Sequence, residues 1–215
     1  MQEFAVHHAS VYREWQEKYT DLVNEIFEKK KIKTFLDIGA NTGAVIQFIT
    51  DRHQLEKVYA FEPFETNFLL LREFIQRNLS GKFEFELHDK AIFYGVESAK
   101  ACGTGDGNTG GMFLSNVRDE YVSISTVETG PIFKCSTLEK ELSHVDHVDL
   151  AKIDVEGSEW NILENSSFLK DKTNDILLEF HWLDEEQSKS FIRKHMPDFE
   201  IVTILSNTMW LSRKA

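Results

Sequence analysis

The sequence predicts a single α/β domain built on a mainly parallel sheet. Short apolar strands alternate with amphipathic helices along the chain, which is typical of parallel strands joined by right-handed crossovers. With 215 residues, 41% of them hydrophobic, the chain is long enough to bury one substantial core. No internal repeat or linker interrupts the alternation, so we expect one domain.

An amphipathic helix is predicted before the first strand, in an N-terminal helical segment over residues 1–31. Its apolar residues recur at three- and four-residue spacing from Tyr12 to Phe27, and the cations of Lys29 to Lys31 suit a helix end. We expect this segment to pack on the flank of the domain over residues 32–215, rather than to act as a lid or partner helix.

The following segments alternate between the apolar pattern of a buried strand and the three- and four-residue spacing of a helix. Pro63 is expected in the first turn of the second of these helices, where its missing N–H costs little. Strands are predicted at Thr34–Ile38, Val58–Phe61 and Phe83–Leu87, and helices at Ala44–Thr50 and from Pro63 to Ile75.

After the third strand, a glycine-rich stretch from Gly95 to Gly111 breaks the rhythm, and an inserted hairpin or edge pair is expected from Tyr121 to Lys134. A short helix capped by Ser136 or Thr137 follows. The remaining elements are expected as a strand (Val148–Ile153), one helix (Trp160–Phe168), a strand (Ile176–Phe180), a helix (Asp184–Met196) and a hairpin (Phe199–Leu205 with Thr208–Leu211).

Charge and composition exclude several classes of protein. The 36 acidic against 24 basic residues give a net charge of −12, which disfavours a nucleic-acid partner. No apolar run approaches the roughly 18 residues of a membrane span, and residues 1–10 do not resemble a targeting signal. The two cysteines, Cys102 and Cys135, are expected to be reduced thiols, with a single disulfide between them as the alternative. We therefore expect a cytoplasmic protein without a membrane partner.

The strongest local signal is the segment 36–43, LDIGANTG, in which a strand runs into a glycine turn and a helix. Gly39 and Gly43 permit close approach of an adenosyl-type ligand, and Asp37 could fix the loop or face the ligand. The spacing differs from the G-x-G-x-x-G of dinucleotide binders. An ordinary strand–turn–helix remains the alternative.

Two further acidic positions follow the next strands. Glu62 comes roughly 20 residues after the glycine loop, where a carboxylate can reach a ribose diol. Asp89 could accept a hydrogen bond from an adenine amino group, beside an apolar edge at Ala91 and Ile92. The alternatives are a carboxylate favoured by a helix dipole and a solvated turn.

The fourth and fifth predicted strands end in chemically active side chains. Asp154 lies at the carboxyl end of the fourth strand, where ligands bind in open α/β sheets. Glu156 and Glu159 come next, and are best explained by the dipole of the helix that they begin. His181 could act as a base near neutral pH, although a structural role is more common at such a position.

Together these motifs resemble the FkbM family of S-adenosylmethionine-dependent methyltransferases. The resemblance implies a Rossmann-like class I methyltransferase fold, with a seven-stranded mostly parallel sheet ending in an antiparallel hairpin. It also implies transfer to hydroxyl oxygens of sugars or secondary metabolites. By family position, Asp37, Gly39 and Gly43 would flank the methionine part, Glu62 the ribose and Asp89 the adenine. Further expected cofactor-binding residues are Ala40, Asn41, Pro63 and Ala91. The segments that carry the resemblance are LDIGANTG (36–43), FEP (61–63), DKAI (89–92), KIDVEGSE (152–159) and LEFH (178–181).

The implied cofactor suggests a mechanism. Transfer is an in-line displacement by oxygen, so the protein must align the reactants and help to remove a proton. Asp154 or His181 is the predicted base. A variant places Mg²⁺ on Asp154 and Glu179, since oxygen ligands suit that ion.

Alternatives from other classes remain open at this point. A nucleotide- or NAD-dependent oxidoreductase shares Glu62 and the sheet, and a non-catalytic adenosyl-binding module shares the fold. A nucleic-acid amino-methyltransferase is disfavoured, because residues 154–157 read DVEG rather than N-P-P-Y. We expect a small-molecule or glycan acceptor; a homo-oligomer remains open.

Overall fold

The computed structural model describes residues 2–102, 113–114 and 131–214. The helices are α1 (Gln2–Lys18), α2 (Thr20–Lys29), α3 (Ala44–Thr50), α4 (Glu65–Asn78), α5 (Leu138–Glu141), α6 (Glu159–Asn165), α7 (Ser167–Lys172) and α8 (Glu185–His195). The strands are β1 (Thr34–Ile38), β2 (Lys57–Phe61), β3 (Glu84–His88), β4 (Ala91–Ile92), β5 (Ser98–Cys102), β6 (Phe113–Leu114), β7 (Ile132–Ser136), β8 (Val148–Ile153), β9 (Thr173–Glu179), β10 (Phe199–Leu205) and β11 (Thr208–Arg213).

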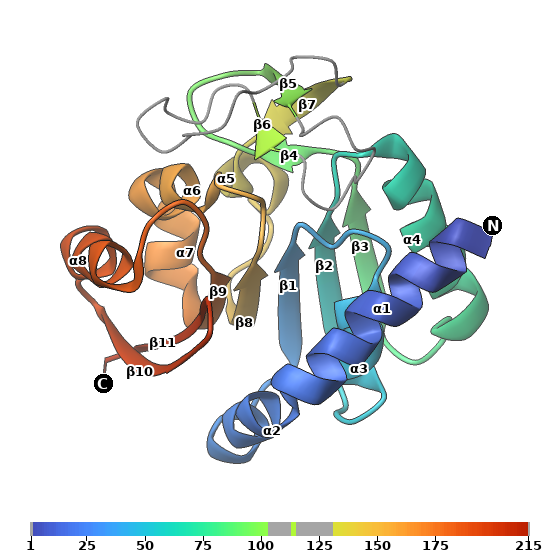
Figure 1. Cartoon of the computed structure of the whole chain (residues 1–215), viewed down its shortest axis with the longest axis horizontal. Coiled ribbons are helices and arrows are strands. Elements are labelled where there is room, and N and C mark those ends of the chain that lie inside the picture. The colour runs from blue at the N-terminus through green and yellow to red at the C-terminus, as the bar shows by residue number, and fades with distance from the viewer. Residues whose placement is uncertain (1, 103–112, 115–130, 215) are drawn as a thin grey trace.

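A seven-stranded sheet in the order β10-β11-β9-β8-β1-β2-β3 forms the centre of the fold (Figure 1). The strands β3, β2, β1, β8 and β9 are parallel, whereas β11 runs antiparallel to both β9 and β10. The predicted sheet and its closing hairpin are therefore confirmed.

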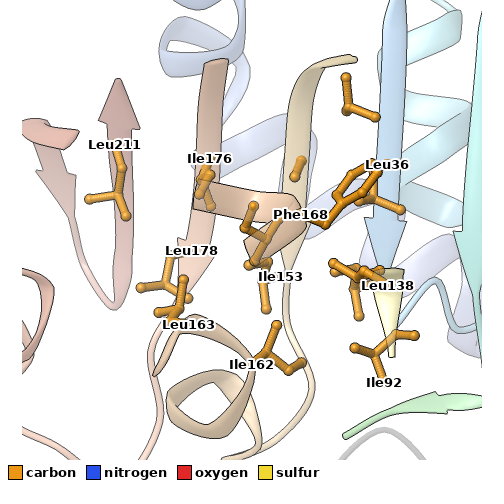
Figure 2. Packing of buried hydrophobic residues seen from close by; sticks show 14 of the residues in the cluster. Leu36, Ile92, Leu138, Ile153, Ile162, Leu163, Phe168, Ile176, Leu178 and Leu211 are labelled. Atoms are coloured by element: carbon orange, nitrogen blue, oxygen red, sulfur yellow. The ribbon is translucent and has the colours of Figure 1, made fainter. Parts of the chain in front are cut away.

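Helices cover both faces of this sheet, because successive strand residues point to opposite sides. Phe35 and Leu177 pack toward α1–α4, whereas Leu36, Ile176 and Leu178 pack toward α5–α8. Figure 2 shows the second of these clusters from close by. Both faces of the central strands are buried, as their nearly continuous apolar sequences require.

The predicted N-terminal helix is two helices. The backbone at Tyr19 leaves helical geometry (φ −116°, ψ 1°), and α2 turns away from α1 (Figure 1). The Tyr19 ring is buried and its hydroxyl accepts a hydrogen bond from Thr208 on β11, so the break anchors the segment to the sheet. The apolar spacing alone does not reveal the break, because the bond from the Val23 N–H to the Tyr19 carbonyl continues the helical pattern.

Two other helix predictions are corrected. Pro63 lies before α4 rather than in its first turn, since Phe64 is the extended N-cap residue. The predicted helix from Trp160 to Phe168 is divided at Ser166, where the extended backbone ends α6. The Ser166 Oγ then caps α7 by accepting a hydrogen bond from the Leu169 N–H.

A second sheet, with the order β4-β7-β5-β6, was not predicted in this form. It lies beyond the carboxyl ends of β1, β2 and β3 (Figure 1). Ile132–Lys134 belongs to β7, which pairs with β4 and β5. The predicted partner Tyr121–Ser125 and the glycines 103–111 lie outside the described residues.

Among the described residues, no helix combines the length and apolar character needed to cross a bilayer.

Candidate active site

A cavity of about 310 Å³ opens at the carboxyl ends of the central strands. Its walls come from α1, the loop after β1, the ends of β2 and β9, strand β4 and the loop after β8. Its lining includes His7, Glu14, Trp15, Tyr19, Gly39, Ala40, Asn41, Glu62, Pro63, Asn67, Lys90, Ala91, Phe133, Lys152, Asp154, Glu156, Ser158 and Glu179. This is the edge at which open α/β sheets bind ligands.

The loop after β1 forms one wall through Gly39, Ala40 and Asn41. Gly39 has a φ of 86°, and a Cβ atom there would lie 1.9 Å from the carbonyl oxygen of Asp154. Only glycine therefore lets this loop cross the end of β8. Gly43 does not line the cavity; it is the left-handed N-cap residue that starts α3.

An ion-paired group lies directly beneath this loop. Asp37 is fully buried and does not line the cavity. The Lys152 Nζ lies 3.3 Å from Asp37 Oδ1 and 3.1 Å from Asp154 Oδ2, and it donates to the Gly39 carbonyl at 2.9 Å. Burial alone would lower the pKa of Lys152, but the two carboxylates outweigh it and raise that pKa. Lys152 therefore stays charged and joins the glycine loop to Asp154.

Glu62 lies at the end of β2 with its carboxylate held by two backbone donors. Its Oε2 accepts from the Asn41 N–H at 2.8 Å, and its Oε1 accepts from the Phe64 N–H at 2.9 Å. The Asn67 side chain adds a hydrogen bond to this carboxylate, whose remaining lone pairs are available to a ligand hydroxyl. The Glu62 side chain is only 6% exposed, and burial raises its pKa to about 7 despite these bonds.

The segment after β3 places the predicted Ala91 and Ile92 on the cavity, but not the predicted Asp89. Lys90 and Ala91 line the cavity, as does Ile92, whereas Asp89 is exposed and lies outside the lining. The physical reason is local: Asp89 lies in the exposed two-residue connection between β3 and β4, while β4 carries Ala91 inward. The Lys90 ammonium donates to both carboxylate oxygens of Glu141 at 2.8 Å.

Carboxylates gather around the ends of β8 and β9. Asp154, Glu156 and Glu179 line the cavity. Behind them, Glu159 is fully buried, and its carboxylate accepts from the Val155 and Gly157 N–H groups at 2.9 and 2.8 Å. Glu159 therefore organises this loop, a role that its place in the first turn of α6 concealed at the sequence level.

His181 lies against this group but does not line the cavity. Its Nδ1 hydrogen-bonds to Glu159 Oε1 at 2.9 Å, and its Nε2 lies 3.5 Å from Glu156 Oε2 and 3.9 Å from Glu179 Oε1. Burial would lower the pKa of His181, but Glu159 and Glu156 raise it to about 10. The imidazole is protonated at neutral pH, and in that state it cannot accept a proton.

Burial and mutual repulsion also change the two outer carboxyl groups. The pKa of Glu156 rises to about 8 and that of Glu179 to about 7, in each case mainly through burial, with the charge of Asp154 adding to it. Among the described residues, the donor atoms that lie close enough to share a metal ion belong to Asp154, Glu156 and His181. Glu179, the predicted partner of Asp154, is outside that group.

Helix α1 supplies cavity residues that the sequence analysis missed. His7, Val11, Glu14 and Trp15 line the cavity, and His7 Nε2 lies 3.3 Å from the Asn41 amide. No sequence signal marks them, because Val11 and Trp15 have the apolar spacing of any helix packed on a domain, and His7 and Glu14 belong to no motif. The expectation of flank packing is therefore incomplete, since this helix also forms a wall of the site.

The parallel sheet with its antiparallel last pair and a cavity at the carboxyl ends defines the fold of the class I methyltransferases. The family model described as "Methyltransferase FkbM domain" matches residues 37–205. The chain belongs to the FkbM methyltransferase family.

The first of three solved structures similar to this chain supports the fold. The FkbM methyltransferase from Methylobacillus flagellatus KT is 15% identical with a TM-score of 0.53; the match covers 84% of this chain and 43% of that one. A ribosomal protein L11 methylase from Lactobacillus delbrueckii subsp. bulgaricus is 14% identical, with a TM-score of 0.49 over 91% of this chain and 79% of that one. The N-terminal domain of EvdMO1, solved with SAH bound, is 10% identical with a TM-score of 0.48; the match covers 91% of this chain and 80% of that one. No curated protein matches the chain in sequence.

Proposed function

We propose that this chain is an S-adenosylmethionine-dependent O-methyltransferase that acts on a hydroxyl of a sugar or a small secondary-metabolite-like acceptor. The observation that carries the proposal is the Glu62 carboxylate, fixed by two backbone N–H groups at the edge of the same cavity as the glycine loop. When bound, the donor supplies an electrophilic methyl carbon on a sulfonium sulfur.

The described residues fit an adenosyl donor along one side of the cavity. Glu62 would accept hydrogen bonds from the ribose hydroxyls, and Ala91 with Ile92 would contact the adenine. The loop 39–41 would hold the amino-acid part, and the buried Asn41 Oδ1, which has no hydrogen-bond partner among the described residues, is an acceptor suited to its ammonium group.

The other end of the cavity would hold the acceptor. Asp154 lines it, and its carboxylate would accept the proton from the acceptor hydroxyl as the oxygen attacks. The charged state of His181 favours Asp154 over His181 for this role. The Lys152 Nζ, which lies 3.1 Å from Asp154 Oδ2, would keep Asp154 beside the glycine loop, so that the base and the methyl donor stay aligned.

Calorimetry with S-adenosylhomocysteine tests donor binding. We expect one molecule to bind per chain, and Glu62→Gln to bind roughly 10- to 100-fold more weakly, because charge-assisted hydrogen bonds contribute about 1.5–3 kcal/mol. Glu200→Gln, an exposed substitution on β10, is the matched control and should bind as the wild type does. Binding of NAD in place of S-adenosylhomocysteine would favour an oxidoreductase and contradict the proposal.

Transfer of a labelled methyl group from S-adenosylmethionine tests the reaction. A panel of sugars and polyols should contain an acceptor, whereas RNA and DNA should not be labelled. Asp154→Asn should reduce labelling at least about 100-fold, since general base catalysis is worth that much, while S-adenosylhomocysteine binding persists. Full activity of Asp154→Asn would exclude this residue as the base, and binding without labelling of any acceptor would favour a non-catalytic module.

A further inference from the structure

Three potential metal ligands come together where we place the acceptor, with Asp154 and Glu156 on the cavity wall and His181 behind them. One donor atom from each of Asp154, Glu156 and His181 lies within 4.8 Å of the others. They come from two separate loops, which follow β8 and β9. We propose that Asp154, Glu156 and His181 form a binding site for a divalent cation, with Glu159 as its supporting residue. The site itself does not depend on the proposed function; only its use in activating an acceptor hydroxyl rests on that proposal.

The histidine is oriented as a metal ligand requires. Its Nδ1 hydrogen-bonds to Glu159 at 2.9 Å, and Glu159 is in turn fixed by the backbone N–H groups of Val155 and Gly157. Metal-binding histidines usually give their second nitrogen to a carboxylate in this way. The Nε2 atom is therefore the one that faces Glu156, at 3.5 Å from Oε2.

An orphan hydroxyl at the same place is an independent sign of a ligand. Ser158 is only 2% exposed and lines the cavity together with Asp154 and Glu156. Its Oγ has no hydrogen-bond partner within the part of the chain that the structure describes. A buried hydroxyl without a partner is costly, and a cation or a water bound to it would satisfy the oxygen.

The local charge also favours a cation. Asp154, Glu156, Glu159 and Glu179 lie around His181, while Lys152 is already bound to Asp37, Asp154 and the Gly39 carbonyl. A bound ion would take the place of the proton on His181 Nε2, while Nδ1 keeps its bond to Glu159.

The ligand set indicates the class of ion. Two carboxylates and one imidazole suit Mn²⁺ and similar transition metals, whereas Mg²⁺ and Ca²⁺ prefer oxygen ligands alone. The alternative is that the imidazolium of His181 is itself the balancing cation and no metal binds.

Titration of Mn²⁺ into metal-free full-length protein, followed by the loss of the free-ion EPR signal, tests the site. We expect one ion per chain. Glu156→Gln and His181→Gln should weaken binding at least tenfold, and Glu159→Gln by about 10- to 100-fold through loss of the supporting bond. Glu200→Gln should leave binding unchanged.

Binding of S-adenosylhomocysteine to each variant shows whether its fold is intact. Absence of Mn²⁺ binding in wild-type protein that binds S-adenosylhomocysteine would overturn the proposal, as would equal Mn²⁺ affinity in folded Glu156→Gln. Mn²⁺ binding without any S-adenosylhomocysteine binding would support the metal site and contradict the proposed methyltransferase function, so the two failures are distinguishable.

Discussion

At the scale of single residues, the site depends on a backbone crossing that tolerates no side chain. Gly39 lies against the backbone carbonyl oxygen of Asp154, so the glycine loop after β1 and the residue proposed as the base are in direct contact. Lys152 joins the same two segments from below through the Gly39 carbonyl and the Asp154 carboxylate. A change at Gly39 must therefore affect both ends of the cavity.

Gly39→Ala is expected to destabilise the protein by at least about 3 kcal/mol and to abolish S-adenosylhomocysteine binding. The new Cβ costs about 1–2 kcal/mol for its left-handed backbone, and overpacking against Asp154 costs more. Urea denaturation and calorimetry measure the two effects. Gly81→Ala is the matched control, since Gly81 has a φ of 78° but no atom within 4 Å of the added Cβ. Equal losses in the two variants would show that the crossing is not tight.

At the scale of elements, α1 matters more for the site than its place outside the sheet implies. His8 hydrogen-bonds to Thr42 and Gln47 at 3.1 and 2.8 Å, which fixes α1 to the glycine loop after β1 and to α3. Trp15 packs on Phe48 of α3, with ring centroids 5.9 Å apart, and also lines the cavity. This helix therefore links the stability of the domain to the shape of the site.

Trp15→Ala should lower the free energy of unfolding by about 3–5 kcal/mol, as expected for a buried tryptophan, and should weaken S-adenosylhomocysteine binding. Val6→Ala on the same helix is the control, because Val6 is 70% exposed and its change should stay within about 0.5 kcal/mol. Chemical denaturation and calorimetry test both variants. Unchanged binding by a destabilised Trp15→Ala would restrict this residue to a structural role.

The elements themselves were largely predictable, because periodicity and caps are local. The predicted boundaries are confirmed for β1, α3 and β8. The helix predicted to start at Asp184 is α8, and Asp184 caps it with a capping box. The contribution of α1 was not predictable, since His7 and Asn41 meet only through tertiary packing. Glu159 was misinterpreted for a related reason: a carboxylate in the first turn of a helix has a local explanation, and only the folded chain shows it beside His181.

At the scale of the whole molecule, the protein buries more carboxylates around one cavity than it balances with cations there. The pKa of Glu156 is raised from an ordinary value of 4.5 to about 8, so the folded state keeps a proton that the unfolded chain releases. The pKa of His181, raised from 6.5 to about 10, acts in the same direction. Stability contributed by these protons is present at low pH and is lost as the pH rises.

Glu156→Gln should therefore reduce the loss of stability between pH 5 and pH 8, about the range between the unfolded and folded pKa values of Glu156. Urea denaturation in EDTA at several pH values measures this difference, and Glu200→Gln should follow the wild type. A steeper decline in Glu156→Gln than in the wild type would contradict the sign of the shift.

The position of β11 between β9 and β10 has a consequence for synthesis. On the ribosome, β9 emerges well before residues 208–213, and until they arrive its free edge has no antiparallel neighbour. An unpaired strand edge is a template for pairing with other chains. Nascent chains halted before β11 should thus aggregate more readily than completed ones.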